Sequence, residues 1–336
     1  MKISKYAMVA FAVIIIVIII MVYKSHQERS NDKPIIVNYE LLSKPELAEN
    51  DRNYIFARHS WIRNDSSGRL YVMDPVQKTI KVFDTNFKYI ESVGRAGQGP
   101  GEMSEPCGID IDRNNYLYVS DAKLMKIIIY DNNHKYFNEI KLKNVFREIN
   151  MAVNSKGDIY VTNSITDNIV TVYNKNGAIT NKFGAINGNI INGDVNTTSI
   201  AIDKDDNVWL AFHYAPIVRK YDCNGVLLKE LNVLTEQISK TKKKEISRND
   251  SNGSSLFSYL DDIVYSNKRI YITNHYYIIS LDPVGIKQIG TYMINVPDSS
   301  DKYNFIYKLS DNRVDKRFYF CSQPTGNIYK IVDQIN

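Results

Sequence analysis

Two histidines hold equivalent places in the sequence, four residues after the central aromatic residue of a short β-rich motif. His213 follows Trp209, and His275 follows Tyr271. Imidazole groups at equivalent places in neighbouring repeats could share a divalent metal ion, although a metal site usually needs three or four protein ligands. No local spacing enforces that geometry. Two histidines that only pack or hydrogen-bond are the simpler interpretation, and no metal or other cofactor is required.

Polar residues recur three positions after the aromatic residue in five of the six motifs, and a histidine stands one position later in the fourth and fifth. We expect them to form a polar rim at which a ligand binds, with the arginine of a nearby glycine-rich loop. Asp and Asn side chains also cap the turns that follow strands, and this structural role is the alternative. The predicted rim consists of Asp74, Asp121, Asn163, His213, Asn274, His275 and Arg95.

An enzymatic alternative would need an acidic residue on one strand, completed by Asn and Asp residues on other strands. Asp110 and Glu148 are candidates by position, and Asp110 alternates with the apolar Ile109 and Ile111. No Gly-x-Ser-x-Gly turn is present, so the sequence shows no serine nucleophile of that type. We therefore assign no catalytic residue.

The elements that carry these residues follow from a repeat. A motif of an aromatic residue between two apolar ones occurs six times, and its central residues lie 47, 42, 49, 62 and 48 positions apart. Turn-forming residues precede each motif, which is typical of a strand that follows a hairpin. The six motifs are Leu70–Val72, Leu117–Val119, Ile159–Val161, Val208–Leu210, Ile270–Ile272 and Phe318–Phe320.

Each motif has strand-like neighbours at nearly constant offsets, so each repeat reads as a unit of four strands. Four apolar residues lie seven positions before the aromatic residues, and a bulky residue ends another strand 10 to 13 positions after all six. Six units of about 40–50 residues predict an all-β, six-bladed β-propeller of four-stranded antiparallel blades. One domain, 34–336, then replaces the two that the length of 336 residues suggests.

The sixth unit lacks a fourth strand, because little sequence remains after its third strand at 327–332. The spare strand 35–41 precedes the first unit. Placing it as the outer strand of the sixth blade closes the ring and removes an open sheet edge. An extended tether between a membrane and the propeller is the alternative for 35–41. A closed ring of this kind is expected to be monomeric.

The second unit carries the most recognisable segment, Gly94–Met103 followed by Pro106–Asp112 and Leu117–Asp121. This segment resembles an NHL repeat, and the Gly-Pro-Gly-Glu loop resembles bacterial six-bladed propellers of the TolB-like, NHL-containing group. The resemblance extends over roughly residues 54–333 at the level of the fold. It implies the fold only, because such propellers include binding proteins, scaffolds, lyases and lactonases.

An uncharged apolar run occupies residues 6–23. As a helix it would span about 27 Å at about 1.5 Å per residue, close to the ~30 Å core of a bilayer. Lys2 and Lys5 favour a cytoplasmic N-terminus. The sequence predicts a stub and transmembrane anchor at 1–23, a linker at 24–33 and an extracytoplasmic, periplasmic propeller. A cleaved signal peptide is the alternative, but no small-x-small cleavage site follows the run.

Composition limits the class of partner. The net charge of +5 among 336 residues is too small to predict nucleic-acid binding. Cys107, Cys223 and Cys321 are widely spaced and predict buried thiols rather than disulfides or a metal site. Long segments at 185–198 and 235–257 join blades on the predicted ligand face, and the second is rich in lysine. The leading prediction is a membrane-anchored, non-catalytic binding module for a protein, peptide or glycan. A metal-dependent hydrolase or lyase is the alternative.

Overall fold

The computed structural model describes residues 33–143, 149–164, 167–185, 196–235, 238–239, 258–275, 277–284, 287–294, 306–312, 314–322 and 325–335. The predicted anchor at 6–23, Glu148 and most of the lysine-rich segment 235–257 lie outside the described residues. Within the described part, no helix is long and apolar enough to cross a membrane.

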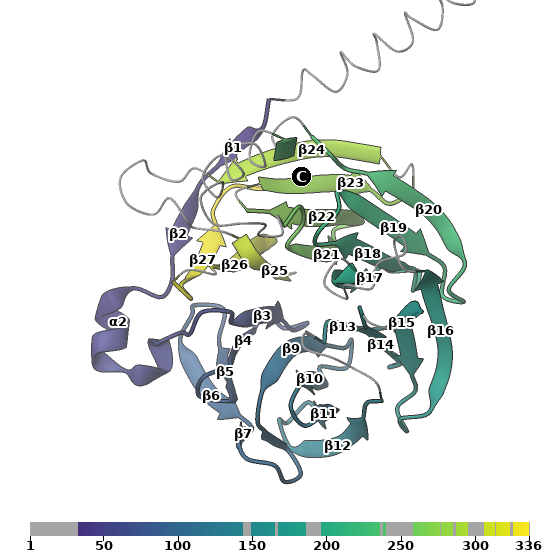
Figure 1. Ribbon diagram of the computed structural model, residues 1–336. Helices are drawn as coiled ribbons and strands as arrows, with labels where there is room; N and C mark the ends of the chain where they lie inside the picture. Colours follow the sequence, from purple (N-terminus) through teal and green to yellow (C-terminus); the bar gives the residue numbers. More distant parts are fainter. Residues whose placement is uncertain are drawn as a thin grey trace, which may run out of the picture.

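Six sheets, each built on four antiparallel strands, are arranged around a common axis, as Figure 1 shows. The first blade contains β3 (Trp61–Asn64), β4 (Leu70–Asp74), β5 (Thr79–Phe83) and β6 (Tyr89–Val93). The second contains β9 (Pro106–Ile111), β10 (Leu117–Asp121), β11 (Lys126–Tyr130) and β12 (Tyr136–Lys141). The third contains β13 (Met151–Val153), β14 (Ile159–Thr162), β15 (Asn168–Tyr173) and β16 (Ile179–Ala185).

The other three blades follow the same order from the inner to the outer strand. The fourth contains β17 (Thr198–Ile202), β18 (Val208–Phe212), β19 (Ile217–Tyr221) and β20 (Leu227–Asn232). The fifth contains β21 (Asp262–Ser266), β22 (Arg269–Asn274), β23 (Tyr277–Asp282) and β24 (Lys287–Ile294). The sixth contains β25 (Ile306–Asn312), β26 (Arg317–Ser322) and β27 (Ile328–Ile331). The prediction of six four-stranded antiparallel blades is confirmed.

Two strands near the N-terminus close the ring. β2 (Tyr39–Leu41) pairs antiparallel with β27 and is the fourth strand of the sixth blade. β1 (Ile35–Val37) instead pairs in parallel with β24, which gives the fifth blade a fifth strand. The expectation that 35–41 forms one strand of the sixth blade is therefore wrong for 35–37. The chain crosses from one blade to the next at Asn38, whose backbone N–H donates to the Asp333 carboxylate at 2.5 Å.

Four short elements lie outside the blades. The helix α2 (Pro45–Asn50) and the 3-10 helix η1 (Arg52–Tyr54) follow β2 and lead into the first blade. Phe83 stacks on Phe87 with ring centroids 4.7 Å apart, and Tyr54 and Phe56 pack against this pair. The parallel pair β7 (Arg95–Ala96) and β8 (Glu102–Met103) forms the glycine-rich link between the first two blades.

The hydrophobic core is divided among the junctions between blades. The described residues form six buried clusters, each drawn from two neighbouring blades. The central aromatic residues of the sequence motifs lie in these clusters, and Trp209 and Tyr271 are fully buried. The aromatic and β-branched residues of the strands thus pack one blade against the next. Each twisted sheet therefore has both of its faces buried against its neighbours.

The innermost strands of neighbouring blades contact one another around the ring, including β25 with β3. They surround a channel with two ends. We call one end the first-turn face, because the turns between the first and second strands of each blade lie there. We call the other end the second-turn face, because the turns between the second and third strands and the links between blades lie there.

Candidate functional site

The turns of the first-turn face share one design. Asp65 accepts backbone N–H groups from Ser67 and Arg69 at 2.9 Å, and its second oxygen accepts the hydroxyl of Tyr71 at 3.2 Å. The Asp or Asn residue of the turn lies six positions before the aromatic residue of the second strand, and this spacing recurs in three more blades. The equivalent contacts join Asp112 to Tyr118, Asn154 to Tyr160 and Asp203 to Trp209.

Burial and charge act on this pair in opposite ways. Burial would raise the pKa of Asp65, but hydrogen bonds from Ser67 and Arg69 outweigh it and hold that pKa below its usual value. Burial together with the Asp65 charge raises the pKa of the Tyr71 phenol. Tyr71 therefore stays a neutral hydroxyl that can both donate and accept a hydrogen bond.

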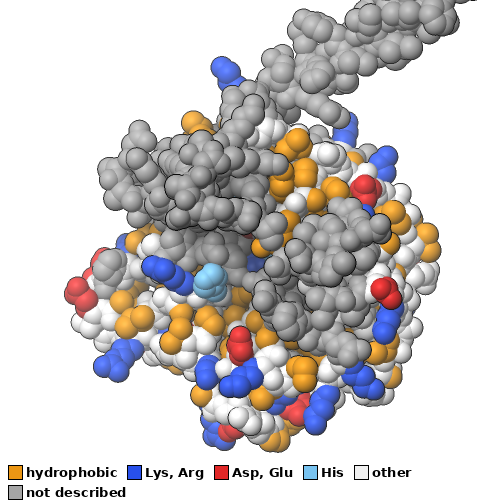
Figure 2. Space-filling view, viewed as in Figure 1, with side chains coloured by type: hydrophobic (Ala, Val, Ile, Leu, Met, Phe, Trp, Pro, Cys, Tyr) orange, Lys and Arg blue, Asp and Glu red, His pale blue; other side chains and the backbone are white. Residues whose placement is uncertain are grey.

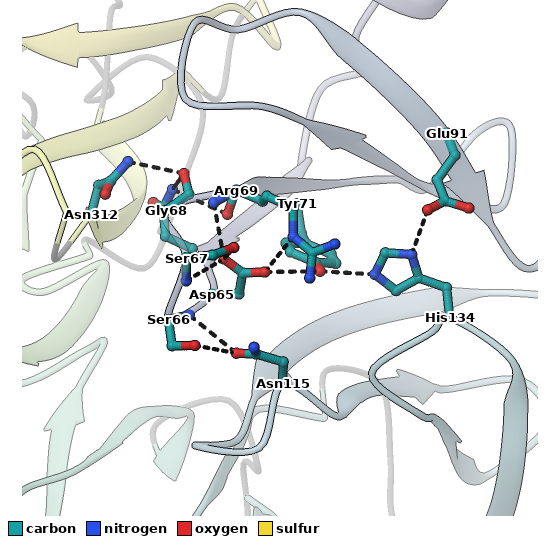
Figure 3. Close-up of polar contacts among 11 residues, drawn as sticks. Asp65, Ser66, Ser67, Gly68, Arg69, Tyr71, Glu91, Asn115, His134 and Asn312 are labelled. Atoms are coloured by element: carbon teal, nitrogen blue, oxygen red, sulfur yellow. Dashed lines mark hydrogen bonds and ion pairs between the residues drawn. The ribbon is translucent and has the colours of Figure 1, made fainter.

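Contacts between turns tie neighbouring blades together on the first-turn face, as Figure 3 shows. Ser66 donates its backbone N–H and its hydroxyl to Asn115 of the second blade. Asn312 of the sixth blade donates to the Gly68 carbonyl at 3.0 Å. The Tyr71 hydroxyl also lies 2.8 Å from Nε2 of His134, whose Nδ1 lies 2.7 Å from Glu91. These contacts hold the turns around the channel in fixed positions.

A cavity of about 560 Å³ occupies the channel toward the first-turn face. All six blades contribute to it through their innermost strands and first turns. Its volume lies in the range of small-ligand sites. Polar and charged side chains make up most of the accessible lining, and aliphatic residues such as Val153 and Ile202 lie between them. The charged lining residues are Arg63, Arg113, Lys204, Lys268, Asp110, Asp112, Asp203, Asp206 and Asp311.

Within the cavity, Arg63 links the innermost strands of several blades. Its Nε lies 3.6 Å from Asp110 of the second blade, and its Nη1 donates to the Leu309 carbonyl of the sixth blade at 3.3 Å. Asp110 also accepts the backbone N–H of Val153 at 2.9 Å. Burial raises the pKa of Asp110 even though Arg63 opposes the shift. Asp110 thus faces the channel, as its place in the strand predicts. There it contacts the first and third blades as well as its own, so it connects three blades.

The predicted rim residues Asp74 and Asp121 are buried turn acceptors on the second-turn face. Asp74 accepts the backbone N–H groups of Val76 and Gln77, and it lies 3.2 Å from Nζ of Lys81. Asp121 accepts three backbone N–H groups, those of Ser104, Glu105 and Leu124. Both side chains are almost fully buried. These two carboxylates therefore cap turns, which is the structural alternative to ligand binding.

The other rim residues differ in exposure. Asn274 is fully buried and donates its side-chain N–H to the Tyr259 carbonyl. Asn163 is buried, and its backbone N–H donates to the Ile169 carbonyl at 2.7 Å. Arg95 is largely exposed and forms an ion pair with Glu102 at 2.8 Å. These contacts do not join the three side chains to one another.

His213 and His275 belong to one hydrogen-bonded chain. Nε2 of His213 lies 2.9 Å from the Ser199 hydroxyl, which also contacts the Asp261 carbonyl at 3.1 Å. Nδ1 of His275 lies 3.1 Å from the Asp261 carboxylate. Burial would raise the pKa of Asp261, but the charge and hydrogen bonds of His275 lower it. Among the described residues, no group of three or more His, Cys, Asp or Glu side chains is placed to hold a metal ion.

The cysteines do not all match the prediction of buried thiols. Cys321 is buried and donates to the Ser60 carbonyl at 2.8 Å, and burial raises the pKa of its thiol to about 12. Cys107 is half-buried, whereas Cys223 is exposed. Cys223 lies in a tight turn after β19, where a side chain points to solvent, so its exposure follows from the turn.

Sequence reasoning missed the residues at the mouth of the cavity. Arg113, Lys204 and Lys268 lie in first turns, which the predicted ligand face excluded. One signal was available in the sequence. Lys268 follows Asn267 in a two-residue hairpin turn, at a place where glycine is the usual residue.

On the face that Figure 2 shows, the charged side chains of the described residues are not concentrated in one place. Figure 2 shows lysine and arginine side chains scattered around the margin of the visible face, interleaved with acidic ones. Apolar side chains lie between them in small groups. The cavity in the channel, rather than a surface of one charge, is thus the site with a defined shape.

The ring is a six-bladed β-propeller, and comparison with known proteins agrees. A family model described as 6-bladed beta-propeller matches residues 59–224. No curated protein matches the chain.

Three solved structures show the breadth of the likeness, which at these identities concerns the fold alone. A candidate exported protein of Bacteroides fragilis is 14% identical, with a TM-score of 0.58 and 91% of this chain and 97% of that chain covered. Virginiamycin B lyase of Staphylococcus aureus, as a catalytically inactive variant with quinupristin, is 14% identical with a TM-score of 0.55, covering 81% and 80%. A fungal Swd1 propeller domain from Myceliophteria thermophila is 9% identical with a TM-score of 0.53, covering 83% and 98%.

Proposed function

We propose that this protein is a binding module without catalytic activity, and that its ligand enters the channel from the first-turn face. The observation that carries the proposal is the cavity of about 560 Å³ to which all six blades contribute. Its position is held by hydrogen bonds between turns, such as those from Ser66 to Asn115. A preformed site of this kind binds without large rearrangement. The ligand is a small molecule or part of a protein, peptide or glycan.

The composition of the cavity favours binding over chemistry. Asp110, the acid that faces the channel, is held by Arg63 and by the backbone of Val153. A general base must instead be able to reach a substrate proton. Asp112 and Asp203 accept backbone N–H groups in their turns and are likewise held. The described lining thus offers hydrogen-bonding and charged groups that position a ligand.

We further propose that residues 6–23 anchor the protein in a membrane and that the propeller lies outside the cytoplasm. The apolar run and the preceding lysines support this topology. The candidate exported protein among the similar structures is compatible with it. We also retain membership of the NHL-containing, TolB-like group as a proposal, because the loop after the first blade carries its motif. Protease accessibility of the propeller in intact cells and in spheroplasts tests the location.

A matched pair of variants tests the binding site. Val153→Tyr places a ring in the cavity, whereas Val314→Tyr places it in an exposed first turn that does not line the cavity. Envelope extracts of the organism that makes the protein are fractionated and added to the full chain in nanodiscs. A fraction should raise the Tm of the wild type and of Val314→Tyr, but not of Val153→Tyr. The compound should be recovered unchanged, and conversion to a product would contradict the proposal.

A metal-dependent hydrolase or lyase is the second candidate function. The contact between Asp261 and Nδ1 of His275 favours it, because a carboxylate often orients a metal-binding imidazole in this way. His213 reaches the same region through Ser199. Metal analysis of the purified full chain tests this candidate. Stoichiometric metal that is lost in both His213→Ala and His275→Ala, but kept in His134→Ala, would support the enzyme and overturn the binding-only proposal.

A further inference from the structure

The fifth blade departs from the turn design of the other five. In the first blade Tyr71 pairs with Arg63, and Asp65, two positions after Arg63, accepts the Tyr71 hydroxyl, as Figure 3 shows. The same register places an Asp or Asn in contact with the aromatic residue in the second, third, fourth and sixth blades. In the fifth blade, the residue in this register with Tyr271 is Ser266. Of the six blades, only this one has serine at that place.

The short turn of the fifth blade explains why serine is tolerated. Ser266 pairs directly with Arg269, and two residues form the turn between them. In the first blade three residues separate Asp65 from Arg69, and Asp65 accepts two backbone N–H groups there. The shorter turn closes through strand pairing, so it needs no carboxylate. Turn formation thus accounts for the loss of the acid but not for the presence of a buried hydroxyl.

Two hydroxyl groups at this place are buried without a hydrogen bond. Ser266 is 2% exposed and Tyr271 is 0% exposed. Neither side-chain oxygen has a hydrogen-bond partner among the residues that the structure describes. An unpaired buried hydroxyl destabilises a fold, whereas an apolar group of the same shape does not. Two such groups in one register therefore indicate a place where a ligand supplies the missing partner.

The sixth blade adds a carboxylate to the same place. Asp311 lies opposite Phe318 in the sheet, and the Phe318 ring is 4.7 Å from the ring of Tyr271. Burial raises the pKa of Tyr271 to about 12, Arg269 opposes this rise, and Asp311 adds to it. The phenol is therefore neutral and can both donate and accept a hydrogen bond. Ser266 and Asp311 both line the cavity, so this polar group borders the channel.

The rest of the lining suits a neutral ligand that is rich in hydroxyl groups. The described lining residues include five carboxylates, four cationic side chains, and several Asn and Ser residues. This near balance of charge favours neither an anion nor a cation. A hydroxyl group both donates and accepts, so it can bond to either kind of lining group. The lining therefore favours sugar hydroxyls over the apolar side chain of a peptide.

An aromatic ring precedes Ser266 in the same strand. Tyr265 is half-buried and is the one aromatic residue in the described part of the cavity lining. The backbone N–H of Lys204 donates to its phenol oxygen, which holds the ring against the fourth blade. A sugar ring presents C–H groups on one face, and these pack against an aromatic ring. β21 thus offers an aromatic surface and a hydroxyl group at adjacent positions.

We propose that the cavity binds a neutral oligosaccharide, one hydroxyl group of which contacts Ser266 and Tyr271. Tyr265 packs against the sugar ring, and Asp311 accepts a hydrogen bond from a neighbouring hydroxyl. This inference rests on the proposed binding function and names the ligand class. Ser266 and Tyr271 select a ligand with a hydroxyl at that position, because an analogue without it leaves both side chains unpaired.

Equilibrium dialysis of the full chain in nanodiscs tests the proposal. The probes are neutral trisaccharides of glucose, galactose, mannose and N-acetylglucosamine. Trigalacturonate serves as an acidic sugar, and N-acetylated tripeptide amides serve as peptides. Mass spectrometry measures what the protein retains. At least one neutral trisaccharide should be retained, and neither the peptides nor trigalacturonate should be.

Three variants separate ligand binding from folding. Tyr271→Phe and Ser266→Ala each remove a hydroxyl without a partner in the described fold, so the Tm should stay equal or rise. Retention of the sugar should fall about five-fold in each, as expected for the loss of one hydrogen bond. Tyr71→Phe is the matched control, because its hydroxyl contacts Asp65 and does not line the cavity. Its Tm should fall while retention of the sugar stays unchanged.

Chemical treatment of the envelope fraction gives an independent test. Periodate cleaves the bond between neighbouring carbons that carry hydroxyl groups, and it should abolish the rise in Tm that the fraction causes. Digestion of the fraction with proteinase K should leave that rise unchanged. The opposite pattern would contradict a glycan ligand.

Three outcomes of the dialysis would overturn the proposal. Retention of the peptides or of trigalacturonate without the neutral sugars would identify another ligand class. Sugar retention that Tyr271→Phe and Ser266→Ala leave unchanged would show that the sugar does not contact these hydroxyls. Retention of no sugar would reject the glycan, whereas the proposed binding function would fail only if the extract fractions also left the Tm unchanged.

Discussion

The two ends of the channel share turn-capping aspartates but differ in their exposed cations. On the second-turn face, Asp74 and Asp121 are buried and their oxygens accept backbone N–H groups. On the first-turn face, the turn acids are engaged in the same way, yet Arg113 and Lys268 extend to solvent around a cavity. The comparison shows that a polar residue recurring at one position of a repeat can serve mainly to build the turn.

The largest effect should come from removing a turn carboxylate on the second-turn face. Asp121→Ala leaves three backbone N–H groups without an acceptor, so unfolding should cost about 3 kcal/mol less. Urea unfolding of the full chain measures it. The control Asp205→Ala removes an exposed carboxylate that pairs only with Lys204, and its effect should stay within about 0.5 kcal/mol. Equal losses of stability in the two variants would contradict the conclusion that buried Asp121 supports the fold and exposed Asp205 does not.

A smaller effect separates two aromatic residues at equivalent places. The Tyr71 hydroxyl contacts both Asp65 and His134, whereas the Tyr271 hydroxyl is buried with no hydrogen-bond partner among the described residues. Tyr71→Phe should therefore lower the free energy of unfolding by about 1 kcal/mol, and Tyr271→Phe should leave it unchanged or raise it. Thermal unfolding of both variants provides the test. A loss in Tyr271→Phe as large as in Tyr71→Phe would show that the hydroxyl contacts contribute nothing.

The smallest effect is a dependence on pH with opposite sign at two aspartates. The folded pKa of Asp65 is lowered, so its charge stabilises the fold above about pH 4 and this contribution is lost as the pH falls through the folded pKa. The folded pKa of Asp110 is raised, so its ionisation opposes folding as the pH rises above about 4. Relative to wild type, Asp65→Asn should lose stability as the pH rises from 3 to 7, and Asp110→Asn should gain it.

Each unit of pKa shift corresponds to about 1.4 kcal/mol, so urea unfolding at several pH values resolves both slopes. Asp84→Asn is a control, because Asp84 caps an exposed turn between the third and fourth strands of the first blade. Parallel slopes for Asp65→Asn and Asp110→Asn would contradict the assignment of Asp110 to the channel and Asp65 to a turn.

The sequence predicted the blades well because each is specified locally. Alternating apolar residues, a central aromatic residue and turn residues at fixed offsets lie within one blade, so Tyr118 and Tyr130 identify strands without knowledge of the ring. The closure was only half predicted. Whether Ile35 pairs with the fifth blade or the sixth depends on contacts with Tyr292, more than 250 residues away, which no local pattern encodes.

The site was harder to predict, for a physical reason. Asp74 and Asp121 look like rim ligands in the sequence, because a turn-capping acid and a ligand-binding acid are the same residue after a strand. Only burial and hydrogen bonds distinguish them. The mouth residues Arg113 and Lys268 were hidden for the opposite reason, since lysine and arginine in turns are ordinary surface residues. The backbone of Lys268 is left-handed, but Lys78 and Lys316 share this feature, so it does not single Lys268 out.

The way the ring closes has a consequence for how the protein is made. β2 lies near the start of the chain and pairs with β27 near residue 331, so the sixth blade is complete only after nearly the whole chain has been synthesised. Until then β2 has no partner, while the earlier blades can already fold as each emerges. Closure is thus a late step over a long sequence separation, which slows folding. Pairing of residues 35–41 with the fifth and sixth blades is thus the step that completes the ring.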